Sequence, residues 1–154
     1  VLAVASKRRA VVGRPERLVW AIDGDGNFQM TAQELVTASY ERIPVKIALL
    51  NNAYLGMVRQ WQEMFYDERY SEVYLSHDLP DYVRWAEAMG CVGIRVESPE
   101  EVAPAIVKAN EVDDRPVVLE FRTDPHVNVF PMVPAGRTNS ELLVDPSQRE
   151  EPSS

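Results

Sequence analysis

Residues 18–26 have the sequence LVWAIDGDG, and residues 45–52 have the sequence VKIALLNN. Each is a short apolar run followed by turn-forming residues, which is the pattern of a buried strand that enters a loop. Between them, Thr31 and Glu34 have the spacing of a capping box, so we expect a helix that begins at Thr31 and ends before Pro44. A strand, a helix and a second strand in this order predict a βαβ unit with parallel strands and a right-handed crossover.

The alternation of strands and helices continues along the chain. Further helices are expected over 56–65, 81–89 and 98–110, and further strands over 91–96 and 116–122. Gly90 is placed to end one of these helices, and Ser98-Pro99 is placed to begin the next. The pattern therefore predicts an α/β fold with a parallel sheet flanked by helices.

Composition narrows the class of protein. The chain has 154 residues, enough for one domain, and a net charge of −8, which argues against a nucleic-acid-binding surface. No apolar run approaches the roughly 20 residues of a membrane span. The single cysteine, Cys91, excludes an internal disulfide and any site of several cysteines. We expect a soluble cytoplasmic protein with neither nucleic acid nor membrane as a partner.

The expected organisation has three parts. Residues 1–11 form an atypical N-terminal segment in which Ser6-Lys7-Arg8-Arg9 introduces charge. Residues 12–123 form the α/β domain. Residues 124–154 contain prolines and mixed charges and predict an extended tail that is frayed after about residue 145.

The polar residues that follow the first two strands predict a binding site. Ligands of parallel sheets bind outside the carboxyl ends of the strands, so Gly24-Asp25-Gly26 and Asn51-Asn52 are expected to be neighbours in space. The glycines permit close approach of the backbone, and the helix expected at Thr31 would turn N–H groups towards a phosphate. A carboxylate beside a phosphate requires a cation between them, and carboxylate and amide oxygens suit Mg²⁺. We therefore expect a metal-bridged diphosphate at this edge.

Two other interpretations compete with this one. A Rossmann nucleotide site is disfavoured because Gln29 stands where the third glycine belongs and Asn51-Asn52 replaces the ribose-binding acid. Asp-Gly and Asn-Asn pairs are also ordinary turn formers, so either motif alone would favour a simple turn. The two motifs together, at matching strand ends, favour a site.

These residues resemble a known family. The two glycines around Asp25, followed after 24 residues by Asn51-Asn52, are similar to the signature of thiamine-diphosphate-dependent enzymes. The surrounding segments resemble the catalytic subunit of acetolactate synthase (acetohydroxyacid synthase) from about Val12 to about Asn139. They are GDGNFQMTAQEL, IPVKIALLNNAYLGMVRQWQEMFY, ERYS and PMVPAGRTN. The resemblance implies the thiamine-diphosphate-binding fold and, here, its pyrophosphate-binding domain.

The resemblance also implies roles in holding the cofactor. Asp25, Asn52 and the main-chain carbonyl of Tyr54 would ligate Mg²⁺. Gly24, Gly26 and Asn27 would lie against the diphosphate of thiamine diphosphate.

A further group of residues would face the rings and the substrate. Met57 would lie beside the rings of the cofactor, and Met57, Val58 and Trp61 would line the substrate channel. Without the resemblance, the apolar positions of the helix 56–65 favour a core-facing side instead.

The implied reaction is decarboxylation of pyruvate and transfer of the remaining unit to a second 2-keto acid, pyruvate or 2-oxobutyrate, in branched-chain amino acid biosynthesis. The family completes its site with a pyrimidine-binding domain of a second subunit, carries FAD in a middle domain, and can bind a regulatory small subunit. Because these other domains have no counterpart here, we assign no catalytic residue and expect this chain to be inactive alone. A remnant that only binds Mg-diphosphate, or another thiamine-diphosphate lyase or oxidase, is the alternative.

Three residues of reactive type are interpreted without a catalytic role. His77 and His126 are expected to be surface or tail histidines away from the ligand edge. Cys91 is expected to be a small buried apolar residue.

Overall fold

The computed structural model describes residues 18–76, 78 and 80–145. Its strands are β1 (Val19–Gly24), β2 (Val45–Asn51), β3 (Val92–Val96) and β4 (Val117–Arg122). Its helices are α2 (Asp25–Thr31), α3 (Glu34–Tyr40), α4 (Gly56–Phe65), α5 (Tyr82–Ala88) and α6 (Pro99–Glu111), with a short 3₁₀ helix at Asn139–Glu141. Residues 1–11, His77 and the chain end beyond 145, for which the sequence made predictions, lie outside this range.

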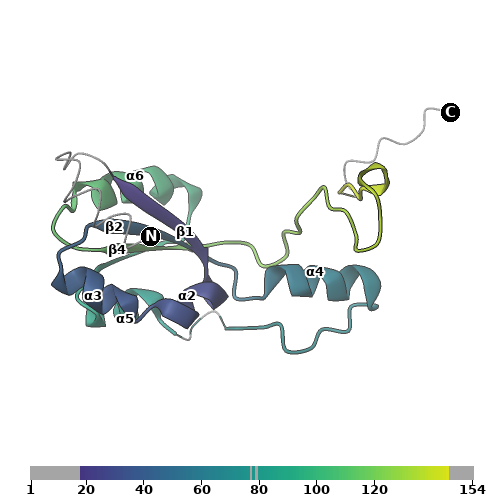
Figure 1. Cartoon of the computed structure of the whole chain (residues 1–154), viewed down its shortest axis with the longest axis horizontal. Helices are drawn as coiled ribbons and strands as arrows, with labels where there is room; N and C mark the ends of the chain where they lie inside the picture. The colour runs from purple at the N-terminus through teal and green to yellow at the C-terminus, as the bar shows by residue number, and fades with distance from the viewer. Residues whose placement is uncertain (1–17, 77, 79, 146–154) are drawn as a thin grey trace.

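The four strands form one parallel sheet in the order β1-β2-β4-β3. Helices α2, α3 and α5 lie on one face of the sheet, and α6 lies on the other (Figure 1). The predicted α/β fold with a parallel sheet flanked by helices is therefore confirmed.

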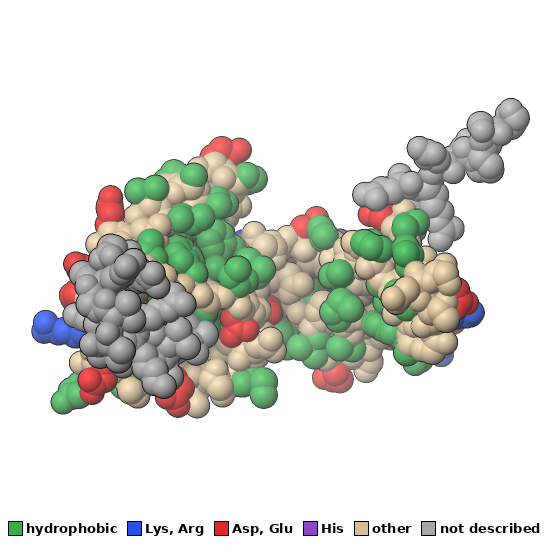
Figure 2. Space-filling view, turned by 45° about the horizontal axis from the view of Figure 1, so that its top comes forward, with side chains coloured by type: hydrophobic (Ala, Val, Ile, Leu, Met, Phe, Trp, Pro, Cys, Tyr) green, Lys and Arg blue, Asp and Glu red, His purple; other side chains and the backbone are tan. Residues whose placement is uncertain are grey.

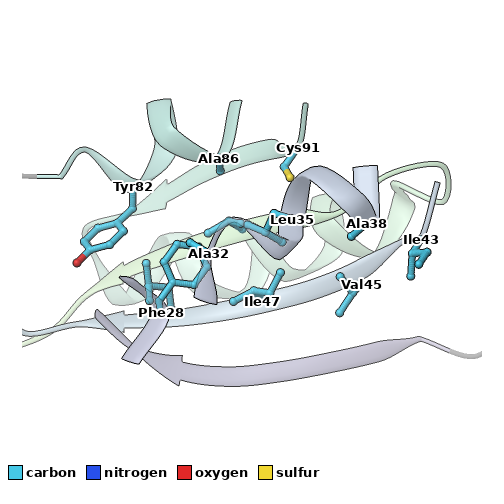
Figure 3. Packing of buried hydrophobic residues seen from close by; sticks show 12 residues of the cluster. Phe28, Ala32, Leu35, Ala38, Ile43, Val45, Ile47, Tyr82, Ala86 and Cys91 are labelled. Atoms are coloured by element: carbon cyan, nitrogen blue, oxygen red, sulfur yellow. The ribbon is translucent and has the colours of Figure 1, made fainter. Parts of the chain in front are cut away.

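Both faces of the sheet are packed. In β4, Val118 belongs to the core beneath α2, α3 and α5, whereas Val117 and Leu119 belong to the core beneath α6. Figure 3 shows Phe28, Leu35 and Tyr82 between the helices and the sheet. The rings of Phe28 and Tyr82 meet edge to face at 5.8 Å. Cys91 is buried in this core as predicted, and burial raises the pKa of its thiol to about 11.

The first crossover differs from the prediction. The chain passes directly from β1 into α2 at Asp25, and the helix predicted to begin at Thr31 begins instead at Glu34. Gly24 has an extended backbone and ends the strand, Asp25 is favourably placed as an acid in the first turn, and Phe28 is buried. Packing of Phe28 thus organises a helix where the sequence indicated only a loop.

Other element boundaries follow the prediction closely. Helix α4 covers the predicted residues, and α6 has the expected capping box between Ser98 and Glu101. Gly90, which follows α5, has a φ of +80°, a left-handed conformation that glycine adopts without strain.

Helix α4 and the segment 123–145 extend beyond the carboxyl edge of the sheet (Figure 1). The segment has little regular structure, and it packs along α4. Gln60 of α4 donates to the Val129 carbonyl and accepts from the Val129 N–H, both at 3.0 Å. Among the described residues, no helix combines the length and the apolar character that crossing a membrane requires.

Candidate cofactor-binding site

The carboxyl ends of three strands meet at one edge of the sheet. Gly24 at the end of β1 pairs with Leu50 of β2, and Asn51 pairs with Arg122 at the end of β4. A cavity of about 640 Å³ lies beyond this edge. It is lined by Gly24, Asp25, Gly26, Asn27, Leu50, Asn52, Tyr54, Leu55, Gly56, Met57, Val58, Thr123, Asp124 and Val127. All the residues predicted to hold the metal and the cofactor therefore surround a single cavity.

Asp25 is the buried acid of this cavity. Its residue is only 4% exposed, and its carboxylate is held by two backbone donors. Oδ1 accepts from the N–H of Gly26 and Oδ2 accepts from the N–H of Ala53, both at 2.9 Å. Because the second donor belongs to the loop after β2, this bond joins the two motifs that the sequence predicted to be neighbours.

The loop after β2 has a fixed shape. Ala53 has a φ of +62°, which a residue with a side chain adopts only where its surroundings compensate the strain. Its carbonyl accepts from the N–H of Leu75 at 2.7 Å, and the N–H of Leu55 donates to Val73 at 2.8 Å. The loop is thus held by an adjacent extended segment on one side and by Asp25 on the other.

Gly24 and Gly56 differ in what lies beside the backbone where a side chain would stand. A methyl group added at Gly24 would meet nothing within 4 Å, so the backbone there borders open space. At Gly56 such a group would lie 2.9 Å from Nδ2 of Asn52. Gly56 therefore leaves the room that the Asn52 side chain occupies at the cavity wall.

The donor set can be tested against a divalent cation. Asp25 with its carboxylate, Asn52 with its amide and Tyr54 with its main-chain carbonyl line the same cavity, and Oδ1 of Asn52 accepts from the Tyr54 N–H at 3.1 Å. The described residues contain no cluster of three or more histidines, cysteines or acids suited to a metal. An oxygen-only set with a single charge, completed by ligand phosphates, suits Mg²⁺ better than it suits Zn²⁺. These residues fit a metal that is bound together with a diphosphate.

Tyr82 and Gln29 support the backbone of Asp25 with hydrogen bonds. The hydroxyl of Tyr82, which is 2% exposed, donates to the Asp25 carbonyl at 3.2 Å and lies 2.9 Å from Nε2 of Gln29. Burial, followed by the nearby Asp25 carboxylate, raises the pKa of Tyr82 to about 12. The phenol therefore remains a hydrogen-bond donor over the physiological range of pH.

Helix α4 presents its apolar side outward. Met57 and Val58 line the cavity but are 49% and 48% exposed, whereas Arg59 and Gln60 are buried. The interpretation of this helix as core-facing on its apolar side is therefore wrong. Trp61 does not line the cavity; its ring packs on that of Phe65 at 4.8 Å.

The sequence analysis did not predict some of the residues that line the cavity. Thr123, Asp124 and Val127 line the cavity because β4 also ends at the carboxyl edge. The rule that placed the first two loops here applies equally to this third strand end. His126, predicted to lie away from the ligand edge, lines a smaller cavity of about 210 Å³ beside Tyr54, with its Nδ1 3.0 Å from the Arg59 guanidinium.

A family profile matches this chain. It is described as the C-terminal TPP binding domain of thiamine pyrophosphate enzymes and covers residues 2–121. The chain belongs to this family. The resemblance inferred from the glycine and asparagine motifs is thereby confirmed, and the profile begins ten residues before the domain start expected at residue 12.

Among thiamine pyrophosphate enzymes, this domain is similar to acetolactate synthases. The acetolactate synthase of Mycobacterium avium is 54% identical over 143 residues, which are 91% of this chain and 23% of the relative. The acetolactate synthase isozyme 2 large subunit of Escherichia coli is 44% identical over 134 residues, 87% of this chain and 24% of the relative.

A solved structure shares the fold. The thiamine diphosphate-dependent 4-hydroxybenzoylformate decarboxylase of Rhodococcus jostii RHA1 matches with a TM-score of 0.64 and 29% identity, over 75% of this chain and 21% of that chain. This domain spans about a quarter of the length of the curated relatives it matches.

Proposed function

We propose that this chain is the part of an acetolactate synthase that holds the diphosphate and the metal of thiamine diphosphate. The observation that carries the proposal is the Ala53–Asp25 hydrogen bond, which joins two loops whose residues Asp25, Asn52 and Tyr54 line a single cavity. The similarity to acetolactate synthases over most of this chain supports the choice of enzyme.

Several residues that line the cavity have a proposed role in binding the cofactor. Asp25, Asn52 and the Tyr54 carbonyl hold Mg²⁺, whose charge screens the diphosphate from the Asp25 carboxylate. Gly24, Gly26 and Asn27 lie against the diphosphate, at the end of β1.

The apolar end of the cavity receives the rings and the substrate. Met57 lies beside the cofactor rings, while Val58 and, farther along α4, Trp61 border the channel through which 2-keto acids enter. Thiamine diphosphate, when bound, supplies the electron sink that decarboxylation of a 2-keto acid requires. The substrates are pyruvate and, as a second acceptor, 2-oxobutyrate, and the products lead to branched-chain amino acids.

The site is completed by other parts of the enzyme. Figure 2 shows hydrophobic side chains at the surface over α4 and the C-terminal segment. Leu55, Met57 and Val58, which line the cavity, are between 40% and 49% exposed. This apolar wall is covered by the pyrimidine-binding domain of a second subunit. We place the enzyme in the cytoplasm, with an FAD-binding middle domain and a regulatory small subunit as further partners.

One other activity has support of its own. The structural similarity to a 4-hydroxybenzoylformate decarboxylase favours, as a second candidate, a thiamine-diphosphate enzyme that releases the decarboxylated product without a second 2-keto acid.

A domain exchange tests the proposal. The corresponding segment of the Mycobacterium avium acetolactate synthase is replaced by this chain, and the hybrid enzyme is assayed for acetolactate formation from pyruvate. We expect formation of acetolactate that requires both Mg²⁺ and thiamine diphosphate. A folded hybrid that releases acetaldehyde but no acetolactate would support the decarboxylase, and one that binds no thiamine diphosphate would identify the chain as a remnant.

A further inference from the structure

Glu120 is a fully buried carboxylate in the middle of the sheet. Its residue is 0% exposed, and it lies on β4, beside β2 and β3. Oε2 accepts from Nε of Arg95 at 2.9 Å, and Oε1 lies 2.9 Å from Nε of Arg122. A buried carboxylate is tolerated only where it is paired and hydrogen-bonded, and Glu120 is paired with both arginines.

The same carboxylate determines how the Asn51 side chain is oriented. Nδ2 of Asn51 donates to Oε1 of Glu120 at 2.7 Å. The amide of asparagine donates through its nitrogen and accepts through its oxygen, so this bond directs Oδ1 away from Glu120 and towards Ala53. There Oδ1 accepts from the N–H of Ala53 at 3.0 Å. The reversed amide would set acceptor against acceptor at Glu120 and donor against donor at Ala53.

Ala53 is the point where this chain of bonds reaches the cavity. Its N–H is shared between Oδ1 of Asn51 and Oδ2 of Asp25. The residue is fully buried and left-handed, a conformation that needs such support. Asn52 and Tyr54 flank it, so the position of Ala53 sets where both of these proposed ligands lie.

We propose that Glu120 and Asn51 are positioning residues of the metal site: Glu120 orients the Asn51 amide, and Asn51 holds the Ala53 N–H against Asp25. Neither residue lines the cavity, so both act through the loop 52–54 and not by contact with the cofactor. The inference rests on the function proposed above, because it assigns the loop to metal binding.

The outer end of the network offers a matched control. Arg95 also donates to Oδ1 of Asp81 at 2.8 Å, at a side chain that is 32% exposed. Asp81→Asn weakens the pairing of Arg95 but leaves the bond between Glu120 and Asn51 in place. It reports the loss of the ion pairs that Asp81 makes with Arg84 and Arg95, without a change in the loop.

Two readouts on the full chain test the inference, one of them independent of the cofactor. Hydrogen exchange of the Ala53 amide, followed by NMR, reports on the loop, and titration of Mg²⁺ with thiamine diphosphate reports on the site. We expect Glu120→Gln to accelerate hydrogen exchange of the Ala53 amide selectively. We also expect it to weaken Mg²⁺ binding by about 10- to 100-fold, the usual effect of losing a residue that orients a metal ligand. Asp81→Asn should change neither quantity.

Asn51→Ala keeps Glu120 paired with both arginines, and so it tests the same step if Glu120→Gln does not fold. We expect the same selective losses from it. Folded variants with wild-type Ala53 exchange and Mg²⁺ affinity would overturn the inference. If the unaltered chain itself binds no Mg²⁺ with thiamine diphosphate, the proposed function fails, whereas unchanged Ala53 exchange in Asn51→Ala would refute the positioning step separately.

Discussion

The N–H of Ala53 donates to Oδ2 of Asp25 at 2.9 Å, across a separation of 28 residues. This bond links the residue that follows β1 to the loop after β2, and Asp25, Asn52 and Tyr54 line one cavity there. The parallel sheet makes the meeting possible, because neighbouring strands of parallel direction end at the same edge. The candidate cofactor site is thus a consequence of the crossover connection together with one long-range hydrogen bond.

Gly56→Ala is expected to separate metal binding from stability. The added methyl group would lie 2.9 Å from Nδ2 of Asn52, so that side chain must move away. We expect the fold to tolerate this shift, because Nδ2 is the far end of the Asn52 side chain and because alanine favours a helix more than glycine does. We expect Mg²⁺ affinity to fall by about tenfold while the free energy of unfolding stays equal or rises. Calorimetric titration and urea denaturation check the two quantities, and a parallel loss of both would contradict the argument.

Tyr82→Phe should destabilise the chain by about 1–2 kcal/mol near neutral pH, because the Asp25 carbonyl and Gln29 lose the hydroxyl they share. The phenol ionises near pH 10 in the unfolded chain and near 12 in the folded one. Stability contributed by the protonated phenol is therefore complete below pH 10 and declines as the pH rises towards 12, by at most about 3 kcal/mol.

The phenylalanine variant lacks that decline. The difference in unfolding free energy between the two chains should narrow between about pH 9 and about pH 11 in urea denaturation. A difference that widened with pH would show that the folded state prefers the ionised phenol.

Gln60→Ala should release the C-terminal segment from α4. Gln60 is 1% exposed and makes two hydrogen bonds with the backbone of Val129, so its loss leaves the N–H and the carbonyl of Val129 without this partner. We expect faster proteolysis within residues 124–145. The matched control is Gln62→Ala, because Gln62 makes the same pair of bonds with Ser71 at an exposed position. Equal proteolysis of the two variants at this segment would contradict the assigned role of Gln60.

The sequence was sufficient to predict the parallel sheet and the meeting of Asp25 and Asn52 at one cavity. Continuous apolar runs such as 45–50 predict strands buried on both faces, and the rule for parallel strand ends then brings Asp25 and Asn52 together. These arguments need only local patterns and topology.

Other features depend on contacts that no local pattern encodes. Helix α2 exists because Phe28 packs on Tyr82, and Asn51 is oriented by Glu120, which follows it by 69 residues. The periodicity of α4 identifies an apolar side but not its direction, and here Gln60 turns the polar side inward towards the C-terminal segment.

Titration of the chain with thiamine diphosphate, with and without Mg²⁺, tests the central claim most directly. We predict binding that requires Mg²⁺ and that Asp25→Ala abolishes while circular dichroism stays unchanged. Asp23→Ala is the control, because the Asp23 carboxylate accepts from the adjacent Gly24 N–H and does not line the cavity. Binding that is independent of Mg²⁺, or that survives Asp25→Ala, would contradict a metal-bridged diphosphate at this edge.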